Sequence, residues 1–171
     1  MTYILAQITG LMCTVFSLCI AHLKKVSHIL IGEILLNFTF ILNYALLGGW
    51  SGVCTAGIAT IQALIISFYN KKDKTFPIYL SVVFVGLYSL VTIVTFNTFK
   101  DIFPFIGSTL FTIAIRQKKP FHYRLLKLTL VTMWLVYDLC MLSFGSATTR
   151  LLSISSYVIA IFRNDIKKKT A

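Results

Sequence analysis

Residues 24–47 read KKVSHILIGEILLNFTFILNYALL, and this stretch decides the fold class. A basic pair precedes a long apolar run that holds a single acidic residue, Glu33. A helix that crosses a bilayer needs about 20 mainly apolar residues, and Lys and Arg are in excess at cytoplasmic ends. The stretch therefore predicts a transmembrane helix that enters the membrane from the cytoplasmic side.

The composition of the whole chain favours the same environment. Of its 171 residues, 57% are hydrophobic and 12% are charged, whereas soluble chains are about 25% charged. The net charge of +11 is carried by short basic runs between apolar stretches, with no soluble core beneath them. This pattern indicates membrane topology and not nucleic-acid binding. It also argues against a soluble enzyme and a secreted disulfide scaffold.

Seven apolar stretches are predicted as membrane helices, because each reaches a spanning length alone or with its flanking residues. They are residues 1–21, 26–47, 49–69, 77–96, 102–115, 125–142 and 149–162. The fifth and seventh stretches are short, and residues 99–101 and 146–148 complete them. The first stretch lacks the basic start and cleavage site of a signal peptide, so we expect it to be a helix too.

The basic residues support this count. With seven spans, fourteen of the sixteen Lys and Arg residues fall on one side of the membrane, and only Lys100 and Arg150 fall elsewhere. Cytoplasmic loops carry the Lys and Arg excess. We therefore expect the N-terminus outside and the C-terminus in the cytoplasm.

An internal repeat emerges when the chain is shifted by 94 residues without a gap. The first three stretches then coincide with the last three, and the Lys-Lys-x-x-His motif at 24–28 coincides with that at 118–122. We predict an all-α polytopic protein whose seven transmembrane helices form 3+1+3 parallel repeats. Residues 1–70 form the first unit, 71–98 the linker helix, and 99–171 the second unit with a basic cytoplasmic tail.

Ionisable residues inside the apolar stretches are candidate functional residues. Glu33 lies about 10 Å into the second stretch at 1.5 Å per residue, and Asn37 and Tyr44 follow it on the same helix face. This face predicts a polar cavity lining in which Glu33 binds a proton or a cation. The alternative is a carboxylate that pairs with the inner lysines.

The sixth stretch carries a second set of candidates. Trp134, Tyr137 and Asp138 share a helix face, and the 94-residue shift aligns Tyr137 and Asp138 with Asn43 and Tyr44. An aromatic ring beside an acid or amide suits a small polar ligand. An interfacial aromatic belt with an anchoring carboxylate would give the same pattern.

The third and seventh stretches carry small and polar residues at helical spacing, and most of these serve close packing. Gln62 and Ser156 occupy matched positions in them and are candidates for lining a solute path. Pro104 is expected to break the fifth helix, which either exposes backbone groups to a cavity or only kinks the helix. The predicted substrate-binding residues are Asn37, Asn43, Tyr44, Gln62, Trp134, Tyr137, Asp138 and Ser156.

Enzymes and metal proteins are not favoured by these residues. The cysteines form no C-x-x-C pair, the histidines lack further ligands, and no set of catalytic side chains shares one centre. We therefore expect neither a metal nor a cofactor.

Several short motifs resemble a known family. They are Asn-Tyr-Ala-Leu-Leu-Gly-Gly at 43–49, Asp-Ile-Phe-Pro at 101–104, Trp-Leu-Val-Tyr-Asp at 134–138, Phe-Gly-Ser at 144–146 and Ile-Phe-Arg at 161–163. Through them the chain resembles the YgjV-type bacterial inner membrane proteins, near the PQ-loop, SWEET and PnuC-type transporters. The resemblance implies an inner membrane location and a SWEET-like fold. SWEET-type proteins place an asparagine on the third helix of each repeat near the sugar, and here Gln62 and Ser156 are the candidates for that place.

The expected function is therefore transport or facilitation of a small polar solute, sugar-like or vitamin-like, by alternating access between two three-helix units. The expected partners are the lipid bilayer and the solute, without nucleic acid. The residues leave the oligomeric state, the coupling ion and the direction open. The alternative is a membrane scaffold or small subunit whose polar residues only stabilise the bundle.

Overall fold

The structure is a computed structural model that describes residues 2–21, 26–71, 76–117 and 120–162. Side chains are described for all of these except 18–21, 26–31, 33, 70, 71 and 120. The described residues form seven α-helices and one 3-10 turn, without strands, which confirms the predicted all-α class. The elements are α1 (Thr2–Ala21), α2 (Val26–Leu46), α3 (Trp50–Lys71), α4 (Ile78–Thr95), η1 (Phe99–Asp101), α5 (Ile102–Ala114), α6 (Pro120–Cys140) and α7 (Phe144–Ile161).

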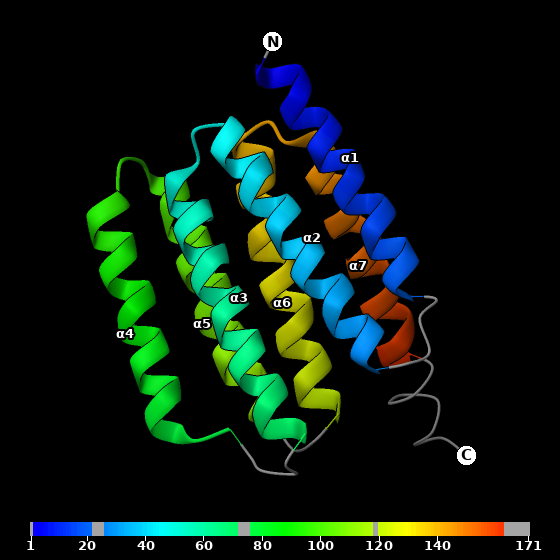
Figure 1. Cartoon of the computed structure of the whole chain (residues 1–171), viewed down its shortest axis with the longest axis vertical. Helices are drawn as coiled ribbons and strands as arrows, with labels where there is room; N and C mark the ends of the chain where they lie inside the picture. The colour runs from blue at the N-terminus through cyan, green and yellow to red at the C-terminus, as the bar shows by residue number, and fades with distance from the viewer. Residues whose placement is uncertain (1, 22–25, 72–75, 118–119, 163–171) are drawn as a thin grey trace.

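Six of the helices form two layers of three, and α4 lies at one edge (Figure 1). In one layer α1, α2 and α3 pack in that order, and in the other α7, α6 and α5 do so. The layers contact each other through the pairs α1–α7 and α3–α5, and α4 packs against α3 and α5. α1 begins at the end of the bundle that also holds the α2–α3, α4–α5 and α6–α7 connections (Figure 1). We call this the N-terminal end.

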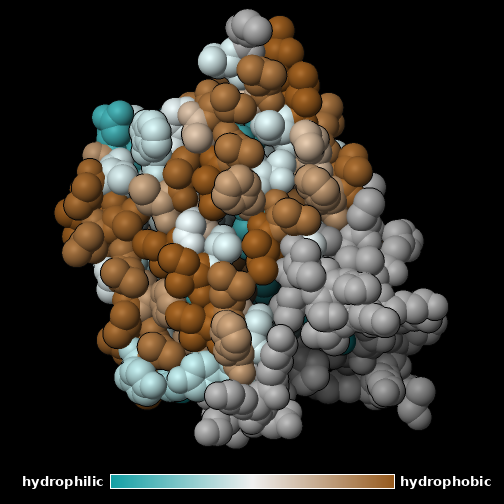
Figure 2. Space-filling view, in the orientation of Figure 1, coloured by the Kyte–Doolittle hydropathy of each residue, from teal (hydrophilic) through white to brown (hydrophobic). Residues whose placement is uncertain are grey.

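Large apolar side chains cover the outward faces of the bundle. Ile93 is 78% exposed, Val82 is 67% exposed and Ile4 is 65% exposed, and Figure 2 shows hydrophobic side chains over much of the described surface. Soluble monomers rarely expose contiguous apolar patches of this size. The surface is therefore suited to contact with lipid.

Two helices are long and apolar enough to cross a membrane by length and composition alone. Among the described residues these are Trp50–Tyr69, with a mean hydropathy of 1.6, and Ile78–Thr95, with a mean hydropathy of 2.1. Shorter apolar segments are Thr2–Ser17 of α1 and Ile34–Leu46 of α2. Of the remaining helices, α5 is too short at 13 residues, and α6 and α7 contain charged residues that lower their hydropathy.

Two helices begin earlier than the apolar pattern predicts. α6 begins at Pro120 and not at residue 125. The apolar pattern did not include its first turns because those turns contain polar and charged residues, although proline is well suited to the start of a helix. α7 begins at Phe144 and not at residue 149. Pro104 lies in the first turn of α5, where its missing amide interrupts no intrahelical hydrogen bond. α5 therefore runs unbroken from Ile102 to Ala114, and the expected helix break is absent there.

Two glycines bring the backbones of α1 and α7 into contact. A Cβ on Gly145 would lie 2.6 Å from the backbone nitrogen of Leu11, and a Cβ on Gly10 would lie 2.8 Å from that of Ser146. Small residues allow membrane helices to approach this closely. The contact fixes α7 against the first layer and sets the position from which its side chains reach the core.

Candidate functional site

Aromatic rings join α2 and α6 at the centre of the bundle. Tyr44 of α2 stacks on Trp134 of α6 with 5.7 Å between the ring centroids, and it meets Tyr137 edge to face at 5.3 Å. Phe40 stacks on Tyr44 at 6.1 Å. All four rings are buried. We call these residues the aromatic cluster, and they form an apolar wall around the polar groups described next.

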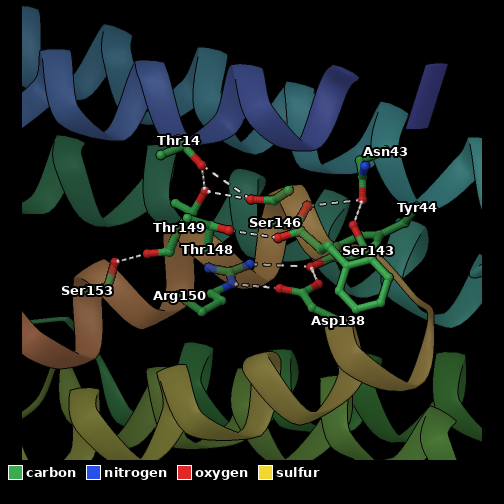
Figure 3. Close-up of polar contacts among 12 residues, drawn as sticks. Thr14, Asn43, Tyr44, Asp138, Ser143, Ser146, Thr148, Thr149, Arg150 and Ser153 are labelled. Carbon is green, nitrogen blue, oxygen red and sulfur yellow. Dashed lines mark hydrogen bonds and ion pairs between the residues drawn. The ribbon is translucent and has the colours of Figure 1, made fainter. Parts of the chain in front are cut away.

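An arginine from α7 reaches a buried carboxylate beside this cluster (Figure 3). The Nε of Arg150 lies 3.3 Å from Oδ2 of Asp138, and the Asp138 side chain has no exposed surface. The Nη2 of Arg150 donates to the hydroxyl of Tyr44 at 3.3 Å, and this hydroxyl donates to Oδ1 of Asp138 at 2.7 Å. We call Tyr44, Asp138 and Arg150 the central triad. Its two formal charges balance each other inside the bundle.

The guanidinium of Arg150 also lies over two rings of the aromatic cluster. Its central carbon is 4.0 Å from the ring centroid of Phe40 and 5.4 Å from that of Trp134. A guanidinium offers five N–H donors in one plane, and Arg150 directs Nε and Nη2 toward described residues. Its side chain is 17% exposed, whereas that of Asp138 is fully buried. The arginine is therefore the accessible member of the ion pair and retains N–H donors in addition to those that it directs at Asp138 and Tyr44.

A polar layer lies between the central triad and the N-terminal end. Oδ1 of Asn43 accepts hydrogen bonds from the hydroxyls of Ser143 at 2.7 Å and Ser146 at 3.1 Å. Its Nδ2 donates to the backbone carbonyl of Ala6. One buried side chain of α2 thereby ties together α1, α7 and the connection between α6 and α7.

Corresponding contacts lie on the other side of the bundle. The hydroxyl of Tyr137 accepts a hydrogen bond from the backbone N–H of Gly52 at 3.1 Å and lies 3.2 Å from the hydroxyl of Ser51. Ser51 donates to Oδ1 of Asp101 in η1, and Oδ2 of Asp101 accepts the backbone N–H of Thr98 at 2.9 Å. These contacts complete the polar layer, which covers the central triad from the N-terminal end.

Five of the predicted substrate-binding residues meet in the aromatic cluster, the central triad and the polar layer. They are Asn43, Tyr44, Trp134, Tyr137 and Asp138. Asn37 is half-buried on α2. The side chain of Glu33, the predicted coupling residue, lies outside the described side chains.

Gln62 and Ser156 are not brought together. Gln62 is buried between α3, α4 and α5, where its Nε2 donates to Thr112 at 2.9 Å and its Oε1 accepts from Tyr88 at 2.7 Å. Ser156 is exposed on α7 and donates to the backbone carbonyl of Leu152. The two matched positions therefore have different surroundings, and Gln62 connects α4 to both layers.

Arg150 is the functional candidate that the sequence analysis missed. It was counted only as a basic residue away from the cytoplasmic side, because it stands at the second position of the predicted seventh stretch. The structure places it seven residues into α7. A usable signal was present, since Asp138 is an acid inside an apolar stretch and such a charge requires a partner.

One cavity of about 540 Å³ lies between α4 and the end of α5, away from the central triad. Its lining is mainly apolar, with Ser81, Thr112, Arg116 and Gln117 as the polar members. Among the described residues, no group of three or more His, Cys, Asp and Glu side chains is placed to hold a metal ion.

The family comparison covers almost the whole chain. The Imp-YgjV family model, described as a bacterial inner membrane protein, matches residues 4–168. The chain belongs to the Imp-YgjV family. The match runs from α1 into the basic C-terminal segment, and it confirms the expected family and the inner membrane location. Neither the curated proteins nor the solved structures gave a match to this Imp-YgjV chain.

Proposed function

We propose that this Imp-YgjV protein transports a small polar solute by alternating access between two three-helix units, α1–α3 and α5–α7. The central triad carries the proposal, because it places a buried ion pair where the two units meet. Ionisable groups at membrane depth are expensive to bury and commonly mark solute or ion pathways. Aromatic rings with a few converging polar groups are also the usual lining of a small-molecule site.

The helix bounds support the division into two units. α2 (Val26–Leu46) and α6 (Pro120–Cys140) begin and end at positions 94 residues apart. α3 and α7 begin at Trp50 and Phe144, which are also 94 residues apart. This is the shift that aligns the sequence motifs, although the bounds of α6 and α7 were not predicted correctly. α4 is then the helix that links the two units.

Contacts between the units support the same relationship. Hydrogen bonds on one side of the bundle recur on the other side with both partners shifted by 94 residues. The related pairs are Asn43–Ser146 with Tyr137–Gly52, and Gln7–Gly145 with Asp101–Ser51. We infer an approximate twofold axis along the membrane normal, as in parallel-repeat transporters of the SWEET type. The hydrogen bond between Tyr44 and Asp138 joins two equivalent positions and therefore lies on this axis.

Transport in this scheme requires the units to part at one end and then at the other. In the conformation described, the polar layer covers the N-terminal end, which the basic residues predict to be external. Opening this end separates Asn43 from Ser143 and Ser146. The lost hydrogen bonds are replaced by bonds to entering water, so the change is compatible with an equilibrium between two states.

A reversible cross-link between the units tests the proposal. The hydroxyl oxygens of Thr14 in α1 and Thr149 in α7 are 2.8 Å apart, so Thr14→Cys with Thr149→Cys should form a disulfide in a background without the native cysteines. We expect proteoliposomes with this double variant to exchange solutes from a mixed metabolite pool when reduced, and to stop when oxidised. Reduction should restore exchange, and each single cysteine variant should be insensitive to oxidant.

The opposite result would favour the scaffold alternative. If protein-containing liposomes take up no solute beyond protein-free liposomes, the protein does not transport. If the cross-linked protein transports at the rate of the reduced protein, the two units do not move as proposed. Mass spectrometry of the vesicle contents measures both outcomes, because it detects whichever member of the metabolite pool enters the liposomes.

A further inference from the structure

We infer that the solute is a small organic monoanion of the carboxylate type, which binds Arg150 while Asp138 takes up a proton. This inference rests on the proposed function, because it names the solute class and the coupling ion for the same site. It changes the assignment made from the sequence, which gave the coupling role to Glu33.

The geometry around Arg150 suits a carboxylate. The planar fork of a guanidinium matches the two oxygens of a carboxylate and can bind them through two parallel hydrogen bonds. The rings of Phe40 and Trp134 lie against this guanidinium at 4.0 and 5.4 Å. Only two of its nitrogens are directed at described residues. The remaining donors and the partial exposure of the side chain allow an anion to approach it.

Charge balance supplies the second step of the argument. The central triad is neutral overall, because one carboxylate faces one guanidinium. An anion that takes the place of Asp138 on Arg150 leaves the Asp138 carboxylate without a counterion in a fully buried position. A buried unpaired charge is unfavourable, and the group is neutralised instead. A hydronium ion from the aqueous phase therefore protonates the Asp138 carboxylate and becomes water, no other covalent bond breaks, and the occupied site is neutral again.

The surroundings of Asp138 leave it as the proton acceptor. The ionisable groups that face it are Tyr44 from α2, Arg150 from α7 and Cys13 from α1, with Tyr137 beside it on α6. α5 contains no ionisable residue. The tyrosines and the thiol are already protonated at neutral pH, and Arg150 is always protonated. In η1, Asp101 lies beyond Tyr137 and is held by Ser51 and Thr98.

The consequence is an electroneutral cycle. The empty site carries a balanced ion pair, and the loaded site carries a guanidinium, one solute anion and a protonated acid. Neither form moves net charge across the membrane potential when the units change position. A neutral solute could not compete with the Asp138 carboxylate for the guanidinium of Arg150. A cation would be repelled by that guanidinium.

Ligand-dependent thermal unfolding of the purified full chain tests the solute class. The probes are benzoate, lactate and gluconate, each compared with a neutral counterpart: benzamide, lactamide and sorbitol. A ligand that binds only the folded protein raises its Tm. We expect at least one of the three anions to raise the Tm and its neutral counterpart to have no effect. Stabilisation by the neutral compounds, or by none of the six, would overturn the inference.

The pH dependence tests the role of Asp138. Because one proton enters with each anion, the apparent Kd should rise about tenfold for each pH unit over the range in which Asp138 is ionised in the empty site and protonated in the loaded site. Asp138→Asn retains Arg150 but has no proton to accept, so its anion affinity should be independent of pH. A purely structural Asp138 would leave the pH profile unchanged in this variant, and that result would overturn the inference.

Two further variants keep the test independent of folding defects. Arg150→Gln combined with Asp138→Asn removes both charges with little change in shape, and it should fold but lose stabilisation by the anion. Arg116→Gln, at the opposite end of the bundle from the polar layer, is the matched control and should retain it. If the double variant is stabilised by the anion as the wild type is, the inference is wrong.

Transport of a neutral solute would also overturn the inference but not the proposed transport, whereas anion binding without uptake would overturn transport alone.

Discussion

The hydroxyl of Tyr44 donates a 2.7 Å hydrogen bond to Asp138, the residue 94 positions further along the chain. Both side chains are fully buried, and each stands near the end of a central helix, α2 or α6. The bond therefore joins two positions that are equivalent under the shift found in the sequence. It places an acid and a phenol on the axis that we propose for the bundle.

Tyr44→Phe removes this bond and leaves the ring in place. Hydrogen bonds to charged groups contribute about 1.5–3 kcal/mol, so we expect the variant to be less stable by about that amount in reversible unfolding from detergent micelles. Tyr3→Phe is the control, because the Tyr3 hydroxyl is part of an exposed residue and makes only a 3.4 Å hydrogen bond. Equal stability of the two variants would contradict the importance of the Tyr44 contact.

Arg150 and Asp138 should be strongly coupled in a double-mutant cycle. Removal of one member of a buried ion pair costs about 3–5 kcal/mol, because the other charge is left uncompensated. Arg150→Gln and Asp138→Asn should each destabilise the protein in this range, and the double variant should lose much less than their sum. Additive losses, measured under the same unfolding conditions, would mean that the two groups do not stabilise each other.

Gly145→Ala should separate α1 from α7. The added Cβ would lie 2.6 Å from the backbone nitrogen of Leu11, and backbone atoms cannot move aside as flexible side chains do. Overpacking of this kind costs about 1–3 kcal/mol. Gly57→Ala is the matched control, since a Cβ there would meet nothing within 4 Å. It should be neutral or stabilising, because alanine is the better helix former. A stable Gly145→Ala protein would show that the contact is looser than described.

The orientation of the bundle can be read from single cysteines. Cys140 is exposed at the last position of α6, at the N-terminal end. A variant that retains only this cysteine should react with a membrane-impermeant maleimide added to intact cells, because we expect this end to be external. Gln117→Cys at the opposite end, in a background without the native cysteines, should react only after the membrane is opened. The reverse pattern would invert the predicted topology.

The helices that the sequence located best are those whose residues are almost all apolar. The bounds of α4 (Ile78–Thr95) fall inside the predicted stretch 77–96, and α2 ends one residue from the predicted end. Hydropathy identified these helices because lipid contact and helix burial both select apolar residues. It placed the beginning of α6 too late, because His122 and Arg124 occupy the first turns of that helix and lower the local hydropathy.

The candidate site was partly predictable for a related reason. Helical spacing brought Trp134, Tyr137 and Asp138 to one face, and the shift by 94 residues paired this face with Tyr44. Arg150 was missed because its partner lies on another helix, and spacing within one helix carries no information about such pairs. The separation of Gln62 from Ser156 was missed because equivalent positions do not share surroundings when a helix packs at only one edge of the bundle. α4 packs against α3 and α5 and contacts Gln62, whereas Ser156 is exposed on α7.

The meeting of Tyr44 and Asp138 also bears on how such a bundle can originate. Two identical copies of a three-helix chain, assembled around a twofold axis, would place tyrosine against tyrosine or aspartate against aspartate. Arg150 is matched by Ala56 at the position 94 residues earlier, so the guanidinium too is present once. A single polypeptide that encodes both halves can evolve each half separately. Such a chain can supply one acid, one phenol and one cation to a common centre, which two identical copies cannot.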